Sequence, residues 1–412
     1  MTMKRTLEDL EVRGLRVLVR LDLNVPLDEQ QRITDDRRIR AALPTLQRLV
    51  ENGGRLILMS HLGRPAGRPD DRLKFSLAPV AERLGALLGK KVTLLGDCVG
   101  DEPEAAVTKL IDGEICLLEN LRFHDAETIK DGKAKDDASL RQQKDAFARQ
   151  LAELADAYVN DAFGTCHRDN ASMLTVPLLM EGKPRAVGYL VQRELEFLGR
   201  ALTEPKRPFV CVLGGAKVSD KLGVIRSLMA RCDTILVGGA MAYTFLAAGG
   251  QEVGKSLVEP ELFDTARRLR AEAGYRLLLP VDCLAASEIK EGATGAVREG
   301  AVPADEMGLD IGPKTIDAYR KVIARARTLL WNGPMGVFET PPFDRGTMAV
   351  AEAMAVATDA GATTVIGGGD SAAAVDKAGL AERMTHISTG GGASLEFLEG
   401  KRFAAIDVLD DL

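Results

Sequence analysis

Arginine and histidine side chains stand where several apolar runs end in the first half of the sequence. The residues at four of these run ends are Asp22, Asn24, His61, Arg64, Arg122, His167 and Arg168, and Arg37 and Arg38 follow the first run. Cations repel one another unless they face an anion, and the arginine fork matches phosphate and carboxylate geometry. Asp22 and Asn24 would read hydroxyl groups. We therefore expect a pocket for a small hydroxylated phosphate or carboxylate rather than a solvated charged face. Taken alone, His61 or His167 fits a histidine satisfied in a turn equally well.

Glycine-rich turns carry the chemistry of the second half. "VLGGAKVSDK" places Gly214 and Gly215 before Lys217 and Lys221, which lie one turn apart on the same helical face. "VIGGGDSAAAV" repeats the arrangement at 365–375, and "STGGGAS" at 388–394 adds a third turn. Backbone N–H groups in such turns can hold phosphate oxygens. The three turns together predict a nucleotide site.

A dehydrogenase is the rival interpretation of the second turn, because Gly367, Gly369 and Ala372 fit the dinucleotide form G-x-G-x-x-A. Asp370 opposes it, since a carboxylate beside a pyrophosphate repels unless a metal lies between them. The acidic residue expected about 20 positions on is also missing, because "HISTGGG" stands there. Mg²⁺ joins a carboxylate to nucleotide phosphates. We therefore expect a nucleoside triphosphate with Mg²⁺ bound by Asp370.

A further phosphate-binding motif, the P-loop pattern, occurs between elements that do not suit it. "GGQEVGKS" matches the P-loop pattern at Gly249, Gly254, Lys255 and Ser256. A working P-loop follows a strand and opens a helix. Here the preceding "AMAYTFLAA" is helical in character, and Pro260 prevents a helix from starting at Lys255. We expect an ordinary loop.

The elements that position these residues are short strands alternating with helices. Runs of four to six apolar residues without polar alternation are typical of strands covered on both faces of a parallel sheet. Stretches with helical spacing that end at glycine separate them, as in "LAPVAERLGALLG". Repeated units of this kind predict a doubly wound α/β fold, in which ligands bind beyond the carboxyl ends of the strands. The run-end residues are therefore the candidate sites.

The length of 412 residues predicts two domains. Segments rich in Pro, Gly and charge flank an amphipathic stretch with Val191, Leu195, Leu198 and Leu202 on one stripe. We expect an N-terminal anion-binding domain at 1–186, a connecting helix and hinge at 187–204, and a C-terminal nucleotide-binding domain at 205–397. The almost wholly polar stretch 125–146 is expected to be a solvated insertion without a function.

Composition excludes several classes of protein. A formal charge of −6 argues against a nucleic-acid binder. No apolar stretch suits a membrane span, and the N-terminus does not resemble a secretory signal. The six cysteines form no C-x-x-C pair, which is typical of reduced thiols in a cytoplasmic protein.

The sequence resembles the phosphoglycerate kinase family along nearly its whole length. The similar stretches, in the family's order, are "RLDLNVPL", "HLGRP", "ENLRF", "DAFGTCHR", "GGAKVSDK", "GLDIGP", "WNGPMGVFE" and "GGGDSAA". Any one of these stretches is weak evidence, but the ordered set is highly specific. The resemblance implies a cytoplasmic monomer that takes 3-phosphoglycerate or 1,3-bisphosphoglycerate in the first domain and MgADP or MgATP in the second.

The resemblance also implies roles for individual residues. Substrate contacts are implied for Asp22, Asn24, Arg38, His61, Leu62, Gly63, Arg64, Arg122 and Arg168. Nucleotide contacts are implied for Gly215, Lys217, Lys221, Gly308, Asn332, Glu339, Gly368, Gly369, Asp370 and Ser371, with Glu339 as the ribose ligand. Catalytic roles are implied for Arg38, Lys217, Gly369 and Gly392, and the metal role for Asp370.

Three departures from the family pattern affect these roles. Asn170 stands where the family often has a second histidine, which puts the role of that histidine in doubt. Arg37 and Arg38 compete for one catalytic place, and matching backwards from "RIRAAL" favours Arg38. The ending "RFAAIDVLDDL" is atypical, so the packing of the tail, about 398–412, on the first domain is an expectation only.

The implied reaction is phosphoryl transfer between 1,3-bisphosphoglycerate and ADP. In reverse, the attacking carboxylate is already ionised at neutral pH, so no general base is required. Closure of the two domains would bring the substrates together and exclude water. The non-enzyme alternative is a sugar-phosphate or nucleotide sensor that keeps the pockets but lacks a transfer residue. The presence of Arg38, Lys217 and Asp370 favours the enzyme.

Overall fold

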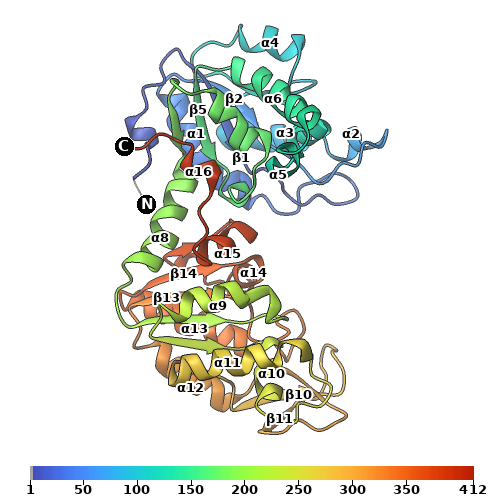
Figure 1. Cartoon of the computed structure of the whole chain (residues 1–412), viewed down its shortest axis with the longest axis vertical. Coiled ribbons are helices and arrows are strands. Elements are labelled where there is room, and N and C mark those ends of the chain that lie inside the picture. The colour runs from blue at the N-terminus through green and yellow to red at the C-terminus, as the bar shows by residue number, and fades with distance from the viewer. Residues whose placement is uncertain (1–2) are drawn as a thin grey trace. The chain divides into compact units, whose positions relative to one another are not determined.

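The computed structural model describes residues 3–412 and divides the chain into two compact units (Figure 1). Unit 1 runs to Leu195 and also includes Arg402–Leu412, whereas unit 2 is Glu196–Lys401. The change between units falls inside α8 (Tyr189–Thr203), which lies within the stretch expected to be the connecting helix. The functional domain limits inferred from the sequence remain our proposal.

Unit 1 is built on a six-stranded parallel sheet of order β3-β4-β2-β1-β5-β6. The strands are β1 (Arg16–Leu21), β2 (Arg55–Met59), β3 (Val92–Leu94), β4 (Ile115–Leu117), β5 (Ala157–Asp161) and β6 (Arg185–Val187). The central strands β1, β2, β4 and β5 are buried along almost their full length, as the uninterrupted apolar runs predict. All neighbouring strands run parallel, so their carboxyl ends meet at one edge.

Helices flank the strands of unit 1 (Figure 1). They are α1 (Arg37–Glu51), α2 (Asp71–Lys74), α3 (Ala78–Leu88), α4 (Asp101–Val107), α5 (Asp131–Ala134), α6 (Ala138–Glu153) and α7 (Val176–Leu179). The late segment with α16 (Ala404–Asp407) joins this unit through charged contacts. The carboxylate of Asp410 accepts hydrogen bonds from Arg5 (3.0 Å) and Arg185 (2.9 Å), so two distant parts of the sequence hold the final residues.

Unit 2 contains a second six-stranded parallel sheet, of order β15-β14-β13-β7-β8-β9. Its strands are β7 (Phe209–Leu213), β8 (Thr234–Val237), β9 (Leu277–Leu278), β13 (Thr328–Asn332), β14 (Thr363–Gly367) and β15 (His386–Ile387). The α/β fold with two doubly wound parallel sheets is therefore confirmed. A separate antiparallel sheet of β10 (Asp282–Ala286), β11 (Ala296–Glu299) and β12 (Met307–Ile311) was not predicted.

The helices of unit 2 alternate with the strands of its parallel sheet. They are α9 (Leu222–Met229), α10 (Met241–Ala248), α11 (Phe263–Ala273), α12 (Pro313–Ile323), α13 (Arg345–Asp359), α14 (Gly369–Lys377) and α15 (Gly392–Leu398). The core between β13 and α13 holds Trp331, which is fully buried. None of the helices within residues 3–412 combines the length and apolar composition that a bilayer crossing requires.

Most residues of the polar stretch 125–146 are exposed, as expected, but the stretch also contains buried charges that anchor it. Glu127 and Lys144 are fully buried within it. The Lys144 ammonium donates to Asp131 (2.8 Å) and to the Asp169 carbonyl (2.5 Å), and Glu127 accepts hydrogen bonds from Ser172. Buried charges require such partners, which composition alone does not reveal.

Candidate active site

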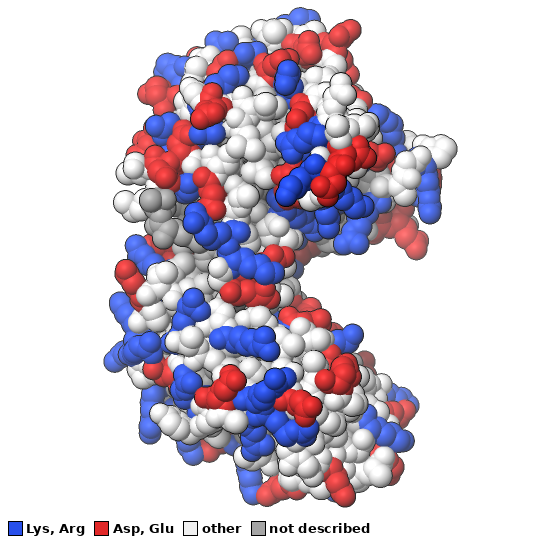
Figure 2. All heavy atoms as spheres, in the orientation of Figure 1, with Lys and Arg blue, Asp and Glu red and all other residues white. Residues whose placement is uncertain are grey.

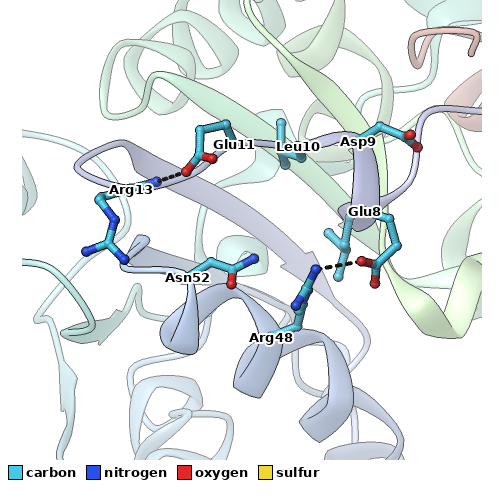
Figure 3. A pocket seen from close by; sticks show the side chains of 8 residues that line it. Glu8, Asp9, Leu10, Glu11, Arg13, Arg48 and Asn52 are labelled. Atoms are coloured by element: carbon cyan, nitrogen blue, oxygen red, sulfur yellow. Dashed lines mark hydrogen bonds and ion pairs between the residues drawn. The ribbon is translucent and has the colours of Figure 1, made fainter.

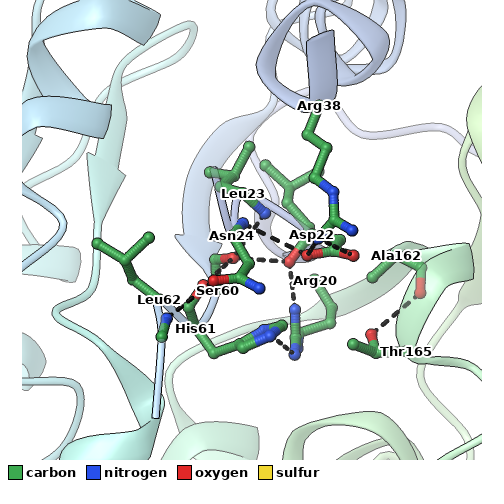
Figure 4. Close-up of polar contacts among 12 residues, drawn as sticks. Arg20, Asp22, Leu23, Asn24, Arg38, Ser60, His61, Leu62, Ala162 and Thr165 are labelled. Carbon is green, nitrogen blue, oxygen red and sulfur yellow. Dashed lines mark hydrogen bonds and ion pairs between the residues drawn. The ribbon is translucent and has the colours of Figure 1, made fainter. Parts of the chain in front are cut away.

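Several of the predicted cations of unit 1 lie near His61, where the carboxyl ends of β1, β2, β4 and β5 meet. Figure 4 shows Arg38 in this region, together with Arg20. Burial lowers the pKa of His61 well below its usual value, and the positive charges of the surrounding arginines lower it further. Those arginines are Arg20, Arg122, Arg168 and Arg38. The imidazole is therefore neutral at physiological pH, and the positive charge of the cluster resides on guanidinium groups.

Arg20 is a central member of this cluster that the sequence analysis did not identify. It lies within β1 and is fully buried. Its Nε donates to the Ser172 hydroxyl (2.9 Å), and Nη2 lies 3.3 Å from Nδ1 of His61. A buried guanidinium with these partners fixes the ring of His61 and adds charge to the site. The signal in the sequence was one arginine inside an otherwise apolar run.

Arg38 and Arg37 point to different partners, although they are neighbours at the start of α1. Nη1 of Arg38 donates to both carboxylate oxygens of Asp22, at 2.8 and 2.9 Å, and the Asp22 side chain is only 8% exposed. Arg37 instead pairs with Asp35 in solvent (2.5 Å). This geometry supports the choice of Arg38 over Arg37 for the site.

Asn24 and Asn120 hold the loop that follows β2. Asn24 Oδ1 accepts from the Gly63 amide (2.8 Å), and Asn120 Oδ1 accepts from the Leu62 amide (3.2 Å). Arg122 donates to the Gly63 carbonyl (2.6 Å). Asn24 therefore positions the backbone of a predicted substrate loop, a role beyond the hydroxyl contact expected from the sequence. Asn120 was not predicted.

Arg122 carries a free donor. Its Nε is buried and has no hydrogen-bond partner among the described residues. Burial, followed by the charges of Arg168 and Arg20, lowers the pKa of Arg122 to about 10, while buried Glu127 partly offsets this effect. A buried unpaired donor amid like charges favours an anionic ligand.

The remaining predicted residues of unit 1 differ in exposure. Arg64 and Arg168 are exposed, and Leu62 is buried. Asn170, which replaces the frequent second histidine, is buried and donates to Glu127 (3.2 Å). Its amide thus belongs to the polar network that surrounds Arg20.

Charge on the visible surface is consistent with an anion site in unit 1. Figure 2 shows Lys and Arg side chains grouped along part of unit 1, whereas both signs of charge alternate over most of the visible face.

A surface cavity of about 500 Å³ lies elsewhere on unit 1 and is shown in Figure 3. It is lined by residues of η1 (Leu7–Asp9) and the end of α1, where Arg48 already pairs with Glu8 (2.5 Å), and it contains none of the predicted site residues.

In unit 2, Lys221 and Asn332 meet at the carboxyl end of β13. The Lys221 ammonium donates to Asn332 Oδ1, and the Nδ2 of this buried amide has no partner among the described residues. Burial lowers the pKa of Lys221 to about 8, with an opposing contribution from the negative charge of Asp370. The pair thus offers a cation and an unused donor beside an acid.

The glycine turn after β14 leads directly into α14. Gly368 has a φ of 87°, a left-handed conformation that favours glycine, and a Cβ there would stand 3.2 Å from Asn332 Nδ2. Asp370 is exposed in the first turn, and the Ser371 hydroxyl accepts from the Gly333 amide (2.6 Å). The open helix start provides unpaired N–H groups.

Other predicted nucleotide residues are exposed around these strand ends. Lys217 and Glu339 are exposed, Gly215 lies in the turn after β7, and Gly392 begins α15. A Cβ at Gly369 or Gly392 would meet nothing within 4 Å. Both helix starts are therefore open to an approaching group.

Gly308 connects the site to the P-loop look-alike. A Cβ on Gly308 would stand 1.8 Å from the Tyr243 hydroxyl, so no other residue fits there without rearrangement. The Gly308 amide donates to the hydroxyl of Ser256 (2.9 Å), which is buried, and Lys255 is exposed. The segment follows α10, not a strand, and the next helical residues begin at Pro260. The interpretation as an ordinary loop is confirmed.

Comparison with known proteins supports the family resemblance that the sequence motifs indicate. Residues 7–401 match the model of the family described as phosphoglycerate kinase. A phosphoglycerate kinase of Rhodopirellula baltica is 52% identical over 411 residues, covering 99% of each chain. One from Chlorobium limicola is 53% identical and covers 99% of this chain and 100% of the relative.

Solved structures agree with the sequence relatives. The structure of phosphoglycerate kinase from Coxiella burnetii has a TM-score of 0.85 at 40% identity and covers 98% of each chain. That of phosphoglycerate kinase from Pyrococcus horikoshii has a TM-score of 0.82 at 32% identity, covering 99% of this chain.

Proposed function

The chain belongs to the phosphoglycerate kinase family and is therefore a phosphotransferase, and we propose which of its residues carry out the transfer. The reaction is phosphoryl transfer between 1,3-bisphosphoglycerate and ADP, giving 3-phosphoglycerate and ATP. Both substrates are small phosphorylated molecules, and each requires cations and backbone donors rather than a deep apolar pocket.

The cluster around His61 binds 3-phosphoglycerate. Arg64, Arg122 and Arg168 neutralise its phosphate, and the unpaired Nε of Arg122 supports this assignment. Asp22 and Asn24 contact its hydroxyl group while they hold Arg38 and the Gly63 loop. Leu62 and His61 complete the wall of the pocket. Arg20 positions His61 from behind and adds charge.

The strand ends of unit 2 bind the nucleotide. Lys217, Lys221 and Asn332 contact the phosphates, together with Gly215 and the turn Gly368–Ser371. Gly308 and Glu339 contact the nucleoside, with Glu339 at the ribose. The partnerless Nδ2 of Asn332 and the open start of α14 support the assignment.

The residues present fit a magnesium ion at Asp370. The carboxylate is exposed in the first turn of α14 and provides the hard oxygen ligand that Mg²⁺ prefers. When bound, the ion neutralises phosphate charge and orients the nucleotide. Asp370 is the residue of this chain that would hold it.

The chemical step requires positioning and charge neutralisation. The acceptor carboxylate of 3-phosphoglycerate is ionised at neutral pH, so the site needs no general base. The neutral His61 agrees, since Arg20 already occupies its Nδ1. Arg38, Lys217 and the backbone amides of Gly369 and Gly392 stabilise the charge that spreads over the transferred group.

Each substrate is assigned to a different unit, so transfer requires the substrates to be brought together with water excluded. We propose that closure of the domains performs this step and that the monomer is sufficient for it, because every residue assigned above comes from one chain.

The observation that carries the proposal is the convergence of four arginines on one buried histidine that follows β2. A coupled assay with 3-phosphoglycerate and MgATP tests it, combined with calorimetric binding of each substrate. We expect turnover that depends on both. A chain that binds both ligands without turnover would favour the sensor alternative.

A further inference from the structure

Three potential metal ligands meet beside the sheet of unit 1, and none of them is among the residues assigned above. Asp97 and Cys98 follow β3, and His124 follows η2 (Leu121–Phe123) after β4. Because β3 and β4 are parallel neighbours, their following loops lie at the same edge. The ligand atoms of the three residues all lie within 4.8 Å of one another.

The three groups lie close enough together for small side-chain shifts to bring all of them to one ion. His124 Nε2 and Asp97 Oδ1 are 2.6 Å apart. The His124 ring stacks on Phe147 with centroids 5.2 Å apart, which holds the imidazole in place. Cys98 is fully buried, whereas the side chains of Asp97 and His124 are each 30% exposed. An ion could therefore enter from solvent and keep a water ligand there.

We propose that Asp97, Cys98 and His124 form a binding site for Zn²⁺, distinct from the magnesium ligand Asp370. Thiolate, imidazole and carboxylate together are the donor set of Zn²⁺, whereas Mg²⁺ takes oxygen ligands. Three protein ligands with one open position are sufficient for a four-coordinate ion.

The charges and protons of binding balance as follows. Cys98 releases its thiol proton to solvent and binds as thiolate. His124 gives up its hydrogen bond to Asp97 and binds through Nε2, and the ring proton transfers from Nε2 to Nδ1 by exchange with solvent. Asp97 binds as the carboxylate. Burial raises the pKa of the Cys98 thiol, and the charges of Asp97 and Glu127 raise it further, so displacement of this proton opposes binding.

Besides His124, two groups compete with the ion for the Asp97 carboxylate: the Cys98 amide, which donates to Oδ1 (2.7 Å), and Arg72. Its Nη2 lies 3.2 Å from Asp97 Oδ2, but its side chain is 58% exposed and stacks over Phe123 at 5.1 Å. An exposed arginine can turn away at little cost, since surface ion pairs contribute little. The bound ion would cross-link the loops after β3 and β4, and the second of these carries Arg122.

Titration of the full-length chain with Co²⁺, a spectroscopic substitute for Zn²⁺, tests the proposal. We expect a thiolate-to-cobalt charge-transfer band that saturates at one ion per chain. Zn²⁺ should abolish the band and excess Mg²⁺ should not. Cobalt bound at Asp370 alone would give no such band, because that ligand contains no sulfur.

Matched variants identify the ligands. Cys98→Ser should lose the band, whereas Cys116→Ser, which removes a buried thiol of strand β4, should keep it. His124→Gln should weaken Zn²⁺ binding by about tenfold or more, and His386→Gln should leave it unchanged. If Cys98→Ser does not fold, the pair of histidine variants decides. Absence of the band, or its persistence without either ligand, would overturn the proposal.

Discussion

Asp22 holds Arg38 by a single guanidinium nitrogen, which donates to both oxygens of the carboxylate at 2.8 and 2.9 Å. The remaining N–H donors of the guanidinium stay available to a ligand, and 36% of the Arg38 side chain is exposed. The acid thus orients the arginine without consuming its hydrogen-bonding capacity. A preoriented donor of this kind loses little on reorganisation when charge develops near it.

Arg38→Ala should therefore lower kcat by about a hundredfold or more, because loss of one charged donor to a transition state costs about 3 kcal/mol. The dissociation constant for 3-phosphoglycerate should change much less, since Arg64, Arg122 and Arg168 remain. Steady-state kinetics and calorimetry separate the two effects.

Arg37→Ala is the matched control, because its side chain pairs with Asp35 in solvent. It should leave kcat nearly unchanged. A large loss of kcat in Arg37→Ala would show that Arg37, not Arg38, is the catalytic arginine. If Arg37→Ala and Arg38→Ala both keep their activity, neither arginine takes part in the mechanism.

Asp370→Asn should raise the Mg²⁺ concentration required for half-maximal rate. The substitution keeps the size of the side chain but removes the charge that binds the ion. Binding of 3-phosphoglycerate should be unchanged, which calorimetry can check. A variant with the magnesium dependence of the parent would exclude Asp370 as the metal ligand.

Two neighbouring substitutions in the P-loop look-alike should differ in how strongly they lower the free energy of unfolding. Ser256→Ala leaves the buried Gly308 amide without its acceptor and should lower the free energy of unfolding by about 1–3 kcal/mol. Lys255→Ala alters an exposed side chain and should change it by at most about 0.5 kcal/mol. Urea unfolding measures both.

Lys255→Ala should also keep turnover and ATP affinity within about threefold, because the side chain is exposed. A far greater loss of nucleotide binding would restore the P-loop interpretation.

Asp310 should make stability fall as pH rises. Burial raises its pKa to about 8, partly offset by hydrogen bonds from the Gly346 (2.6 Å) and Ile311 (2.9 Å) amides. Between the unfolded value near 3.8 and about 8, the native state holds a proton that the unfolded chain has released. The contribution of this group to stability is complete below the unfolded pKa and declines by about 1.4 kcal/mol per pH unit across the window.

Asp310→Asn removes the titration. The free energy of unfolding of the parent should therefore fall steadily relative to that of the variant from pH 5 to pH 7.5. Denaturant unfolding at several pH values measures this difference. Asp305→Asn, at an exposed carboxylate, supplies the reference slope. A constant difference between parent and Asp310→Asn would mean that Asp310 is ionised in the native state throughout.

The parallel sheets were predictable because their central strands are continuous apolar runs. The edge strands β3 and β6 have only three residues each, too few to produce a period. The antiparallel sheet β10–β12 depends on pairing across long loops, such as Cys283 with Arg298, and local sequence does not encode that pairing.

The positions of the candidate residues at strand ends could be predicted because topology fixes where those ends meet, whereas their roles remain our proposal. Arg20 and Glu127 were missed for a different reason. Each is buried through partners distant in sequence, Ser172 in both cases. Lone charges of this kind look like surface residues until the fold brings their partners to them.

The assignment of Arg402–Leu412 to unit 1 has a consequence for biosynthesis. A ribosome delivers this segment only after all of unit 2 has been made. Until then Arg5 and Arg185 lack the Asp410 carboxylate, and Lys4 lacks the carbonyl of Leu409. Synthesis of unit 1 therefore starts before that of unit 2 and is completed after it. During synthesis, unit 2 has its complete set of contacts while unit 1 still awaits its closing segment.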